Sequence, residues 1–404
     1  MLRIHVKDLQ VKFKWLVVLG MILPLLGFRY FGFELSKILY LSFLVSVSIV
    51  LTWFGRNNLM KVDKMTIWLW LGLIGGMFLV SVGRLDGVQY LWGEPGRWQG
   101  LWFFSLLFFM YIELIALSKG DLIKQVGMAW LGGALGTVVI GLGQKIKVGL
   151  GLYALEYAGR TISSVGQPNF WADYLLVGWV LVWFSNRFSK KIRWLSLVVT
   201  VVGLWLSGSR LTMMVFIALV LFLLLRFLRA EVRKVVRVLL SVGIGLSLVF
   251  SVSMGWWAAR LLIWERVVEK IRFKPWFGYG LGNLYDVIET VGFLRTDRAH
   301  NVLLDMWLIG GVGLLLIFIG LWARGVWLAY KNRRKEVLLA LVVWLVLGSI
   351  HVLGVLNWIW LVVLLSLNGK SGGGHKRYSM GQVLLGVLYG LVVLFGVLRG
   401  YSLV

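Results

Sequence analysis

Several residue types are absent or scarce in this 404-residue sequence. It has no cysteine, which excludes disulfide bonds, iron–sulfur clusters, cysteine-ligated zinc and a cysteine nucleophile. Its four histidines are few for a metal centre, so we expect neither a metal nor another cofactor. Only 17 residues are acidic, against 42 lysines and arginines, and the formal net charge is +25. No soluble domain, linker or clear internal repeat stands out, so residues 1–404 are predicted to form a single membrane domain.

Apolar residues, in contrast, are abundant. They make up 60% of the chain, and the mean hydropathy is +0.86. Soluble domains are about 45–50% apolar, so a soluble globule of this composition would expose large apolar patches. The same excess excludes disorder, and nucleic-acid binding is excluded because the basic clusters alternate with apolar runs. The composition predicts an all-α polytopic integral membrane protein, with tryptophans such as Trp322 and Trp358 anchored at the lipid interface.

The apolar runs predict about 12–13 transmembrane helices, the first of which begins at Trp15. Residues 337–368 form either one long tilted helix or two short ones, and the Gly348–Gly354 segment with His351 favours a break. Most basic residues lie on the side of the N-terminus, which the positive-inside rule assigns to the cytoplasm. The other runs cover residues 35–54, 65–83, 99–117, 125–143, 170–185, 194–209, 211–229, 238–257, 301–323 and 381–398.

The predicted extracytoplasmic loop over residues 258–299 is unusual because it carries seven lysines and arginines. The positive-inside rule disfavours basic residues in such a loop, so another role should explain them. In the first part of the loop, from Leu261 to Ile271, leucine, isoleucine and valine are interleaved with arginine and lysine. This pattern predicts an amphipathic helix at the outer membrane interface.

Four local patterns carry the candidate chemistry. They are Gly-Gln-Pro-Asn at 166–169, Ser-Gly-Ser-Arg at 207–210, an Arg260…Trp264 segment followed by a glycine-rich stretch at 275–283, and His300-Asn301. Taken singly, the patterns are typical of turns and helix starts. The glycine-rich stretch is not a dinucleotide-binding loop, because its spacing departs from G-x-G-x-x-G and no βαβ context is present.

In this order, the four patterns resemble the bacterial O-antigen ligase and O-antigen polymerase-like family. The resemblance covers about residues 160–370, whereas the first 150 residues match only in being hydrophobic. Two departures are a glutamine at Gln167, where the family often has asparagine, and a spacing one residue shorter between His300-Asn301 and Gly310. The resemblance implies a membrane glycosyltransferase that moves a glycan from an undecaprenyl-diphosphate carrier to an acceptor hydroxyl. The acceptor is a lipid A-core sugar, another glycan unit or a protein side chain.

The resemblance also assigns roles to residues. Arg210 and Arg260 match the family's key arginines, whose planar, permanently charged guanidinium groups suit a diphosphate. His300 is the predicted general base for the acceptor hydroxyl, and we expect a metal-independent, inverting transfer by these three catalytic residues. The predicted substrate-binding residues are Arg298, Arg295, Asn301, Asn169, Asp173, Asp305 and Trp264.

Alternative functions remain open from the sequence. Within the family they are an O-antigen or capsule repeat-unit polymerase and a protein O-oligosaccharyltransferase. In another class, a lipid-linked glycan flippase or transporter would have repeat symmetry and a midplane site, whereas the charged groups here gather at one face. We expect a multi-pass protein of the bacterial cytoplasmic membrane, with a cytoplasmic N-terminus and an extracytoplasmic active site. Its expected partners are the lipid bilayer, the glycan donor and the acceptor.

Overall fold

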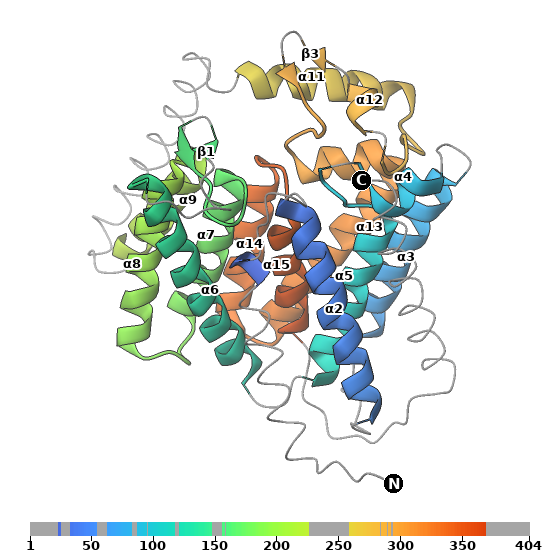
Figure 1. Cartoon of the computed structure of the whole chain (residues 1–404). Coiled ribbons are helices and arrows are strands. Elements are labelled where there is room, and N and C mark those ends of the chain that lie inside the picture. Colours follow the sequence, from blue (N-terminus) through green and yellow to red (C-terminus); the bar gives the residue numbers. More distant parts are fainter. Residues whose placement is uncertain are drawn as a thin grey trace.

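The structure is a computed structural model, and it is almost entirely helical (Figure 1). The predicted spans at residues 238–257 and 381–398 lie outside the residues that it describes, and so does the span that begins at Trp15, apart from residues 23–25. The described residues are 23–25, 33–54, 63–82, 87–94, 96–117, 121–147, 156–157, 159–225, 258–282, 284–288, 290–291 and 294–368.

Most helices follow the predicted apolar runs to within a few residues, but α13 continues eight residues past the predicted end at residue 323, and η1, α4 and α12 are additional short helices. In chain order the helices are η1 (Leu23–Leu25), α2 (Phe33–Phe54), α3 (Lys64–Ser81), α4 (Gly87–Trp92), α5 (Leu101–Leu117), α6 (Leu122–Lys145), α7 (Pro168–Phe184), α8 (Lys190–Ser207), α9 (Arg210–Leu224), α11 (Ala258–Phe273), α12 (Leu284–Ile288), α13 (Val302–Lys331), α14 (Lys335–Gly348) and α15 (Val355–Ser366).

The strands among the described residues form two short antiparallel hairpins. In the first, β1 (Glu156–Tyr157) pairs with β2 (Arg160–Thr161), and in the second, β3 (Thr290–Val291) pairs with β4 (Leu294–Arg295). Each strand is two residues long, so the hairpins close loops and do not form a sheet layer. The predicted all-α fold class is therefore confirmed.

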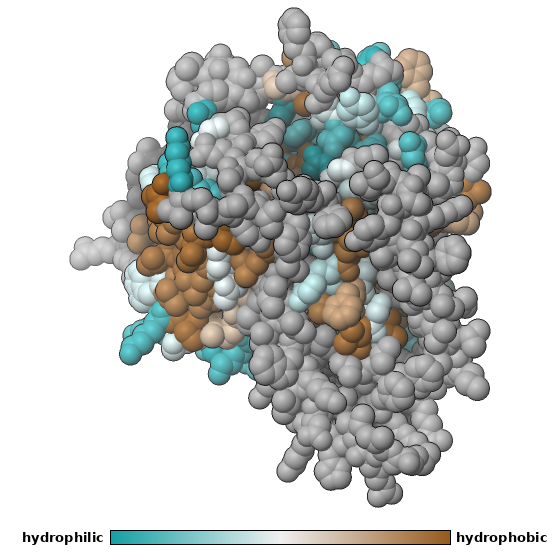
Figure 2. Space-filling model, viewed as in Figure 1, coloured by the Kyte–Doolittle hydropathy of each residue, from teal (hydrophilic) through white to brown (hydrophobic). Residues whose placement is uncertain are grey.

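The membrane character of the bundle is also confirmed. Helices α3, α6 and α13 are long and apolar enough to cross a membrane, and α5, α9 and α15 are shorter apolar helices. On α8, Trp194, Val198, Val201 and Trp205 are exposed at helical spacing, which is the arrangement of a lipid-facing stripe. Figure 2 shows hydrophobic residues over the flank that α6 and α8 form. The number of spans, 12 or 13, stays a prediction.

Helix α11 lies across one end of the bundle (Figure 1), which we call the α11 end. Its Ile263, Val267 and Ile271 recur every fourth residue and are buried, whereas Leu261 and Leu262 are exposed. The helix packs on α13 with the buried side chains turned inward. The predicted helix and its buried apolar face are thus confirmed, and its position at the outer membrane interface stays a prediction.

Two interruptions shape the helices at the α11 end. Helix α14 ends at Gly348 and α15 begins at Val355, with His351 between them, so the predicted break is confirmed. Helix α13 is interrupted by non-helical backbone at Gly311, with φ of 71° and ψ of −171°. Both interruptions free backbone groups that a continuous helix would use internally.

The buried core contains a tryptophan that the sequence predicts to lie at the lipid interface. Trp358 is 3% exposed and packs edge-on against Phe104, with the ring centroids 5.2 Å apart. It also contacts Trp344 and Phe318 at 5.9 and 6.0 Å. The prediction that Trp358 anchors the interface was wrong, because the ring fills the space between α5, α13 and α14.

Candidate functional site

The Gly-Gln-Pro-Asn pattern begins helix α7. The side chain of Gln167 caps the helix by accepting a 2.9 Å hydrogen bond from the Phe170 amide, and Pro168 takes the first position, where it loses no helical bond. Asn169 then lies in the first turn. Its Oδ1 accepts hydrogen bonds of 3.0 Å from Arg160 Nη2 and 3.0 Å from Ser209 Oγ. Asn169 thereby joins the first pattern to the second.

A buried chain of polar side chains continues from Ser209. Its Oγ lies 2.9 Å from Thr212 Oγ1, which donates a 2.8 Å hydrogen bond to Asp173 Oδ1. Asp173 is 1% exposed, and its Oδ2 lies 2.9 Å from His351 Nδ1 and accepts a 3.3 Å bond from Asn357. A carboxylate inside an apolar bundle needs such partners. The network joins α7 and α9 to the α14–α15 break.

The Ser-Gly-Ser-Arg pattern makes the tight connection between α8 and α9. Gly208 has a φ of +58° and ends α8 in the left-handed conformation that glycine adopts without strain. The Ser207 carbonyl accepts a 2.9 Å bond from Arg160 Nε, and Ser209 occupies the N-cap of α9. Arg210 is therefore the first residue of α9, and it is exposed.

The glycine-rich stretch fits into the interruption of α13. The amide of Tyr279 donates to Leu308 O at 2.8 Å, and the amide of Gly280 donates to Ile309 O at 2.8 Å. These are carbonyls that the non-helical Gly311 leaves without their usual helical partners. A Cβ at Gly311 would lie 2.0 Å from the Trp276 carbonyl oxygen, so only glycine permits this approach. The stretch thus has a structural role that fastens the α11 segment to α13.

His300 lies between α11 and α13 in a left-handed backbone conformation, with a φ of 55°. The neighbouring Ala299 is held on both sides: its carbonyl accepts a 2.8 Å bond from Trp264 Nε1, and its amide donates a 2.8 Å bond to Asp305 Oδ1. Asn301 caps α13 through bonds of 3.0 and 3.3 Å from two amides of the first turn. In the structure, these three predicted substrate-binding residues fix the backbone that presents His300.

The surroundings of His300 keep its imidazole neutral. Burial, with contributions from the charges of Arg260, Arg97 and His351, lowers its pKa from 6.5 to about 4, although Asp297 acts in the opposite direction. Burial also lowers the pKa of Arg260, and the charge of Asp173 opposes that shift. At neutral pH, His300 is consequently able to accept a proton.

Residues of the first 100 positions also reach this site, which sequence reasoning missed. Arg97 forms a two-pronged ion pair with Asp297, with Nε–Oδ2 and Nη2–Oδ1 distances of 2.5 and 3.2 Å. Its guanidinium also lies 5.4 Å from the centre of the Phe170 ring, at the start of α7. Burial alone would raise the pKa of Asp297, but the hydrogen bond and charge of Arg97, together with the charge of Arg298, lower it. Asp297 is therefore ionised three residues before His300.

Helix α2 supplies a second missed pair, Glu34 and Lys37. Lys37 is fully buried and donates a 2.8 Å hydrogen bond to the carbonyl of Val165, just before the first motif. Glu34 Oε2 accepts a 2.6 Å bond from the Val355 amide at the start of α15. Charged residues near the end of a predicted span were the available signal. The pair ties α2 to two of the segments that form the site.

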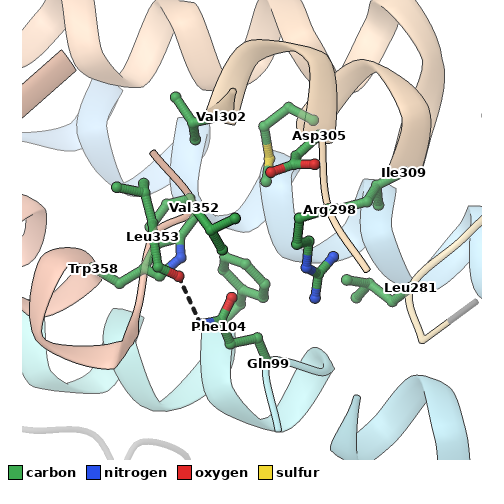
Figure 3. A pocket seen from close by; sticks show the side chains of 11 residues that line it. Gln99, Phe104, Leu281, Arg298, Val302, Asp305, Ile309, Val352, Leu353 and Trp358 are labelled. Carbon is green, nitrogen blue, oxygen red and sulfur yellow. Dashed lines mark hydrogen bonds between the residues drawn. The ribbon is translucent and has the colours of Figure 1, made fainter. Parts of the chain in front are cut away.

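The predicted Arg298 is 4% exposed and lines a small cavity with Gln99 and Asp305 (Figure 3). Gln99 bonds the Leu353 carbonyl at 2.9 Å, which connects the cavity wall to the α14–α15 break. The cavity offers about 20 Å³ to water, enough for one or two molecules and too little for a sugar. The predicted Arg295 lies in β4, where only its backbone is described.

The site is thus a polar cluster at one end of an apolar helical bundle. Figure 2 shows hydrophilic residues gathered beneath α11. The three predicted catalytic residues come from α9, α11 and the segment that precedes α13. Within the described ranges, no group of three or more histidine, aspartate or glutamate side chains could hold a metal ion. The fold defines a multi-pass membrane protein. Its candidate site contains arginines and a histidine.

Comparison with known proteins identifies distant relatives, although no family model matches the chain. The chain is 30% identical over 86 residues to an O-antigen ligase of Pseudomonas aeruginosa, which is 21% of each protein. It is 24% identical over 271 residues to a ComP-specific O-oligosaccharyltransferase of Acinetobacter baylyi, which is 58% of this chain and 48% of that protein. The chain therefore spans less than half the length of the curated relatives it matches. These distant homologues are glycan-ligase-type glycosyltransferases, and they confirm the resemblance to the O-antigen ligase family.

Proposed function

We propose that this protein transfers a glycan from an undecaprenyl-diphosphate carrier to an acceptor hydroxyl at the outer face of the cytoplasmic membrane. The observation that carries the proposal is the placement of His300 directly before α13, where the bonds of Ala299 and Asn301 fix the backbone on either side and the charges of Arg260 and Arg97 act on the imidazole. Each part of such a donor has a matching feature. The apolar bundle suits its lipid tail, the cations suit its diphosphate, and a general base suits the transfer of its sugar. The distant relatives support the same class of chemistry.

In the proposed reaction, Arg210 and Arg260 bind the diphosphate. His300 takes the proton of the acceptor hydroxyl while that oxygen attacks the anomeric carbon. The bond between the anomeric carbon and the diphosphate oxygen breaks, and undecaprenyl diphosphate leaves with the electron pair. Attack from the face opposite the leaving group inverts the anomeric configuration. The arginines stabilise the charge that develops on the diphosphate, so the scheme does not require a metal ion.

The remaining predicted residues have positioning roles in this proposal. Trp264, Asn301 and Asp305 fix the backbone on either side of His300. Asn169 and Asp173 hold α7 against α9 through Ser209 and Thr212, which sets the start of α9 and with it Arg210. Arg298, buried in the wall of the small cavity, has a positioning role as well, and Arg295 is the exception that we assign to the approach of the donor.

The test uses the protein in lipid nanodiscs with a radiolabelled undecaprenyl-diphosphate glycan and an acceptor. We expect His300→Ala and Arg260→Gln each to lower transfer by about 10²–10⁴-fold. Arg272→Gln is the matched control, because Arg272 is an exposed arginine on the same helix as Arg260. Full activity in both site variants would overturn the assignment. Loss of transfer in EDTA that a divalent metal restores would overturn the metal-independent mechanism.

The nature of the acceptor has two candidates. The longer match, over 271 residues, is to a protein named as an O-oligosaccharyltransferase, which favours a protein hydroxyl. The other match favours a glycan acceptor, as in an O-antigen ligase or repeat-unit polymerase. Offering the nanodisc protein a pilin-like protein acceptor and a lipid A-core acceptor in parallel distinguishes them. Movement of labelled donor across a bilayer without transfer would support the flippase alternative instead.

A further inference from the structure

A second cavity opens next to Asp297, whose charge acts on His300. Its volume is about 280 Å³, and Asp297 connects it to His300, three residues further along the chain. Three of its lining residues are carboxylates, and two of them lie near arginines: Asp297 is paired with Arg97, and Glu94 lies 3.9 Å from Arg298. With the third carboxylate, Asp286, these five charges sum to −1. The lining residues are Gln89, Glu94, Gly282, Tyr285, Asp286 and Asp297.

Glu94 is the buried member of this lining, with an exposure of 6%. Its Oε1 accepts a 2.8 Å hydrogen bond from the Tyr285 amide. Its Oε2 has no hydrogen-bond partner among the described residues, and Arg298 Nη2 lies 3.9 Å away, beyond hydrogen-bond distance. Buried carboxylate oxygens are normally bonded, so an unused acceptor in a cavity wall indicates a donor supplied from outside the protein.

The cavity also has the mixed chemistry that a sugar requires. Carboxylate oxygens accept hydrogen bonds from hydroxyl groups, and the amide of Gln89 both donates and accepts. Tyr285 is 44% exposed, so part of its ring is available to the apolar face of a pyranose. Gly282 brings the backbone close to Gln89, because a Cβ there would lie 2.5 Å from the Gln89 carbonyl oxygen. A diphosphate or a uronic acid would instead face the carboxylate of Asp286 and the Oε2 of Glu94 that no hydrogen bond occupies.

We propose that this cavity binds an uncharged sugar residue next to the transfer site and excludes acidic sugars. The inference rests on the proposed function and adds a substrate class to it. Arg210 and Arg260 would take the diphosphate, and the lining of this cavity would take a neutral glycan. The sugar belongs either to the donor or to the acceptor, and both present the same hydroxyl chemistry.

Direct binding tests the proposal without turnover. The probes are an array of trisaccharides that end in a hexose or an N-acetylhexosamine, each paired with its uronic-acid counterpart, and the protein is added in nanodiscs. We expect the neutral member of at least one pair to bind about tenfold more tightly than the acidic member, because like charges at close range repel. We expect Asp286→Asn to reduce that ratio to about threefold or less, since one carboxylate charge is removed.

Matched variants separate the cavity from general effects. Asp286 is exposed at the start of α12, so its substitution leaves the packed core intact. Glu265→Gln is the control, because it removes an exposed carboxylate from α11 outside the cavity, and we expect its ratio to equal that of the wild type. Equal binding of neutral and acidic trisaccharides, no binding at all, or the same ratio in Asp286→Asn as in the control would overturn the proposal.

Two further arms identify the source of the sugar and isolate the proposed function. Displacement of the bound trisaccharide by undecaprenyl-diphosphate glycan, but not by undecaprenyl diphosphate alone, assigns the cavity to the donor. Retention of the trisaccharide in the presence of either lipid assigns it to the acceptor. The variant His300→Ala should bind trisaccharides as the wild type does while it loses transfer. Active transfer without discrimination between sugars therefore removes the cavity proposal alone, and discrimination without transfer removes the proposed function alone.

Discussion

The part of the chain from residue 159 to residue 368 and the part before residue 150 contribute to the site in different ways. The later part supplies His300, Arg210 and Arg260 within short motifs whose backbone is fixed by caps, glycines and turns. The earlier part contains no such motif, yet its Arg97 and Lys37 bond to residues that flank the motifs. The comparison teaches that local sequence patterns present the chemistry, whereas isolated charges from distant helices hold it in place.

The strongest test of this comparison removes Arg97. We expect Arg97→Gln to lower kcat/KM for transfer by about 10²-fold, because Asp297 is left without its charge partner beside His300. Loss of Arg97 should also raise the pKa of His300, because Arg97 lowers it and Asp297 raises it. The acid limb of the pH–rate profile should therefore move to higher pH. An unchanged rate and profile would mean that the earlier part of the chain has no role in the site.

A second, weaker effect is expected at the network that closes on the α14–α15 break. Asp173→Asn should lower kcat by about tenfold, because an amide cannot accept all the bonds that His351, Thr212 and Asn357 make with the carboxylate. Steady-state transfer with saturating donor measures it. Ser189→Ala provides the control, since Ser189 only caps α8 at its other end. Equal kcat values in the two variants would contradict a positioning role for Asp173.

A third effect should appear in stability. Lys37→Met keeps the length of the side chain but removes the bonds to the carbonyls of Phe33 and Val165, and it leaves Glu34 without its ion pair. We expect the melting temperature in nanodiscs to fall by a few degrees, about 2–4 °C for each kcal/mol lost. Intrinsic tryptophan fluorescence follows the transition. A melting temperature equal to that of the wild type would show that the buried ammonium contributes nothing to α2 packing.

The smallest effect concerns pH. The folded pKa of His300 is about 4, below its ordinary value of 6.5, so the imidazole is neutral at pH 7 and protonates only as the pH falls through 4. Transfer should therefore stay nearly constant from pH 7 to about pH 5 and fall by half near pH 4. The buried neutral imidazole also favours the folded state. That contribution to the free energy of unfolding is complete above pH 6.5 and is lost as the pH falls through about 4. A midpoint of kcat/KM near 6.5 would contradict the buried environment of His300.

Local patterns allowed much of the structure to be predicted from the sequence. The amphipathic helix over Leu261–Ile271 and the break at Gly348–Gly354 depend on periodicity and glycine within one segment. The Arg97–Asp297 pair could not be predicted, because its partners are 200 residues apart and each resembles an ordinary loop charge. The cavity lined by Glu94 and Asp286 could not be predicted for the same reason, because its wall comes from segments near residues 90 and 285.

The predicted site residues also divide into those with local contacts, which the sequence could predict, and those with distant contacts, which it could not. That His300 precedes a helix start was visible in the sequence, because Asn301 is a strong N-cap residue. That Asp173 bonds to His351 was not visible, since 178 residues separate them. The predicted roles of all these residues stay predictions until the variants are measured.

The hydrogen bonds between the Pro275–Gly282 stretch and the interrupted helix α13 have a consequence for sequence variation. Loops at the end of a helical bundle usually accept insertions and deletions. Here the amides of Tyr279 and Gly280 pair in register with the carbonyls of Leu308 and Ile309, and Pro275 O accepts from Val312 at 2.9 Å. One added or deleted residue would shift this register and separate the helix that carries Arg260 from the segment that carries His300. The stretch is therefore constrained in length as strictly as a strand within a sheet.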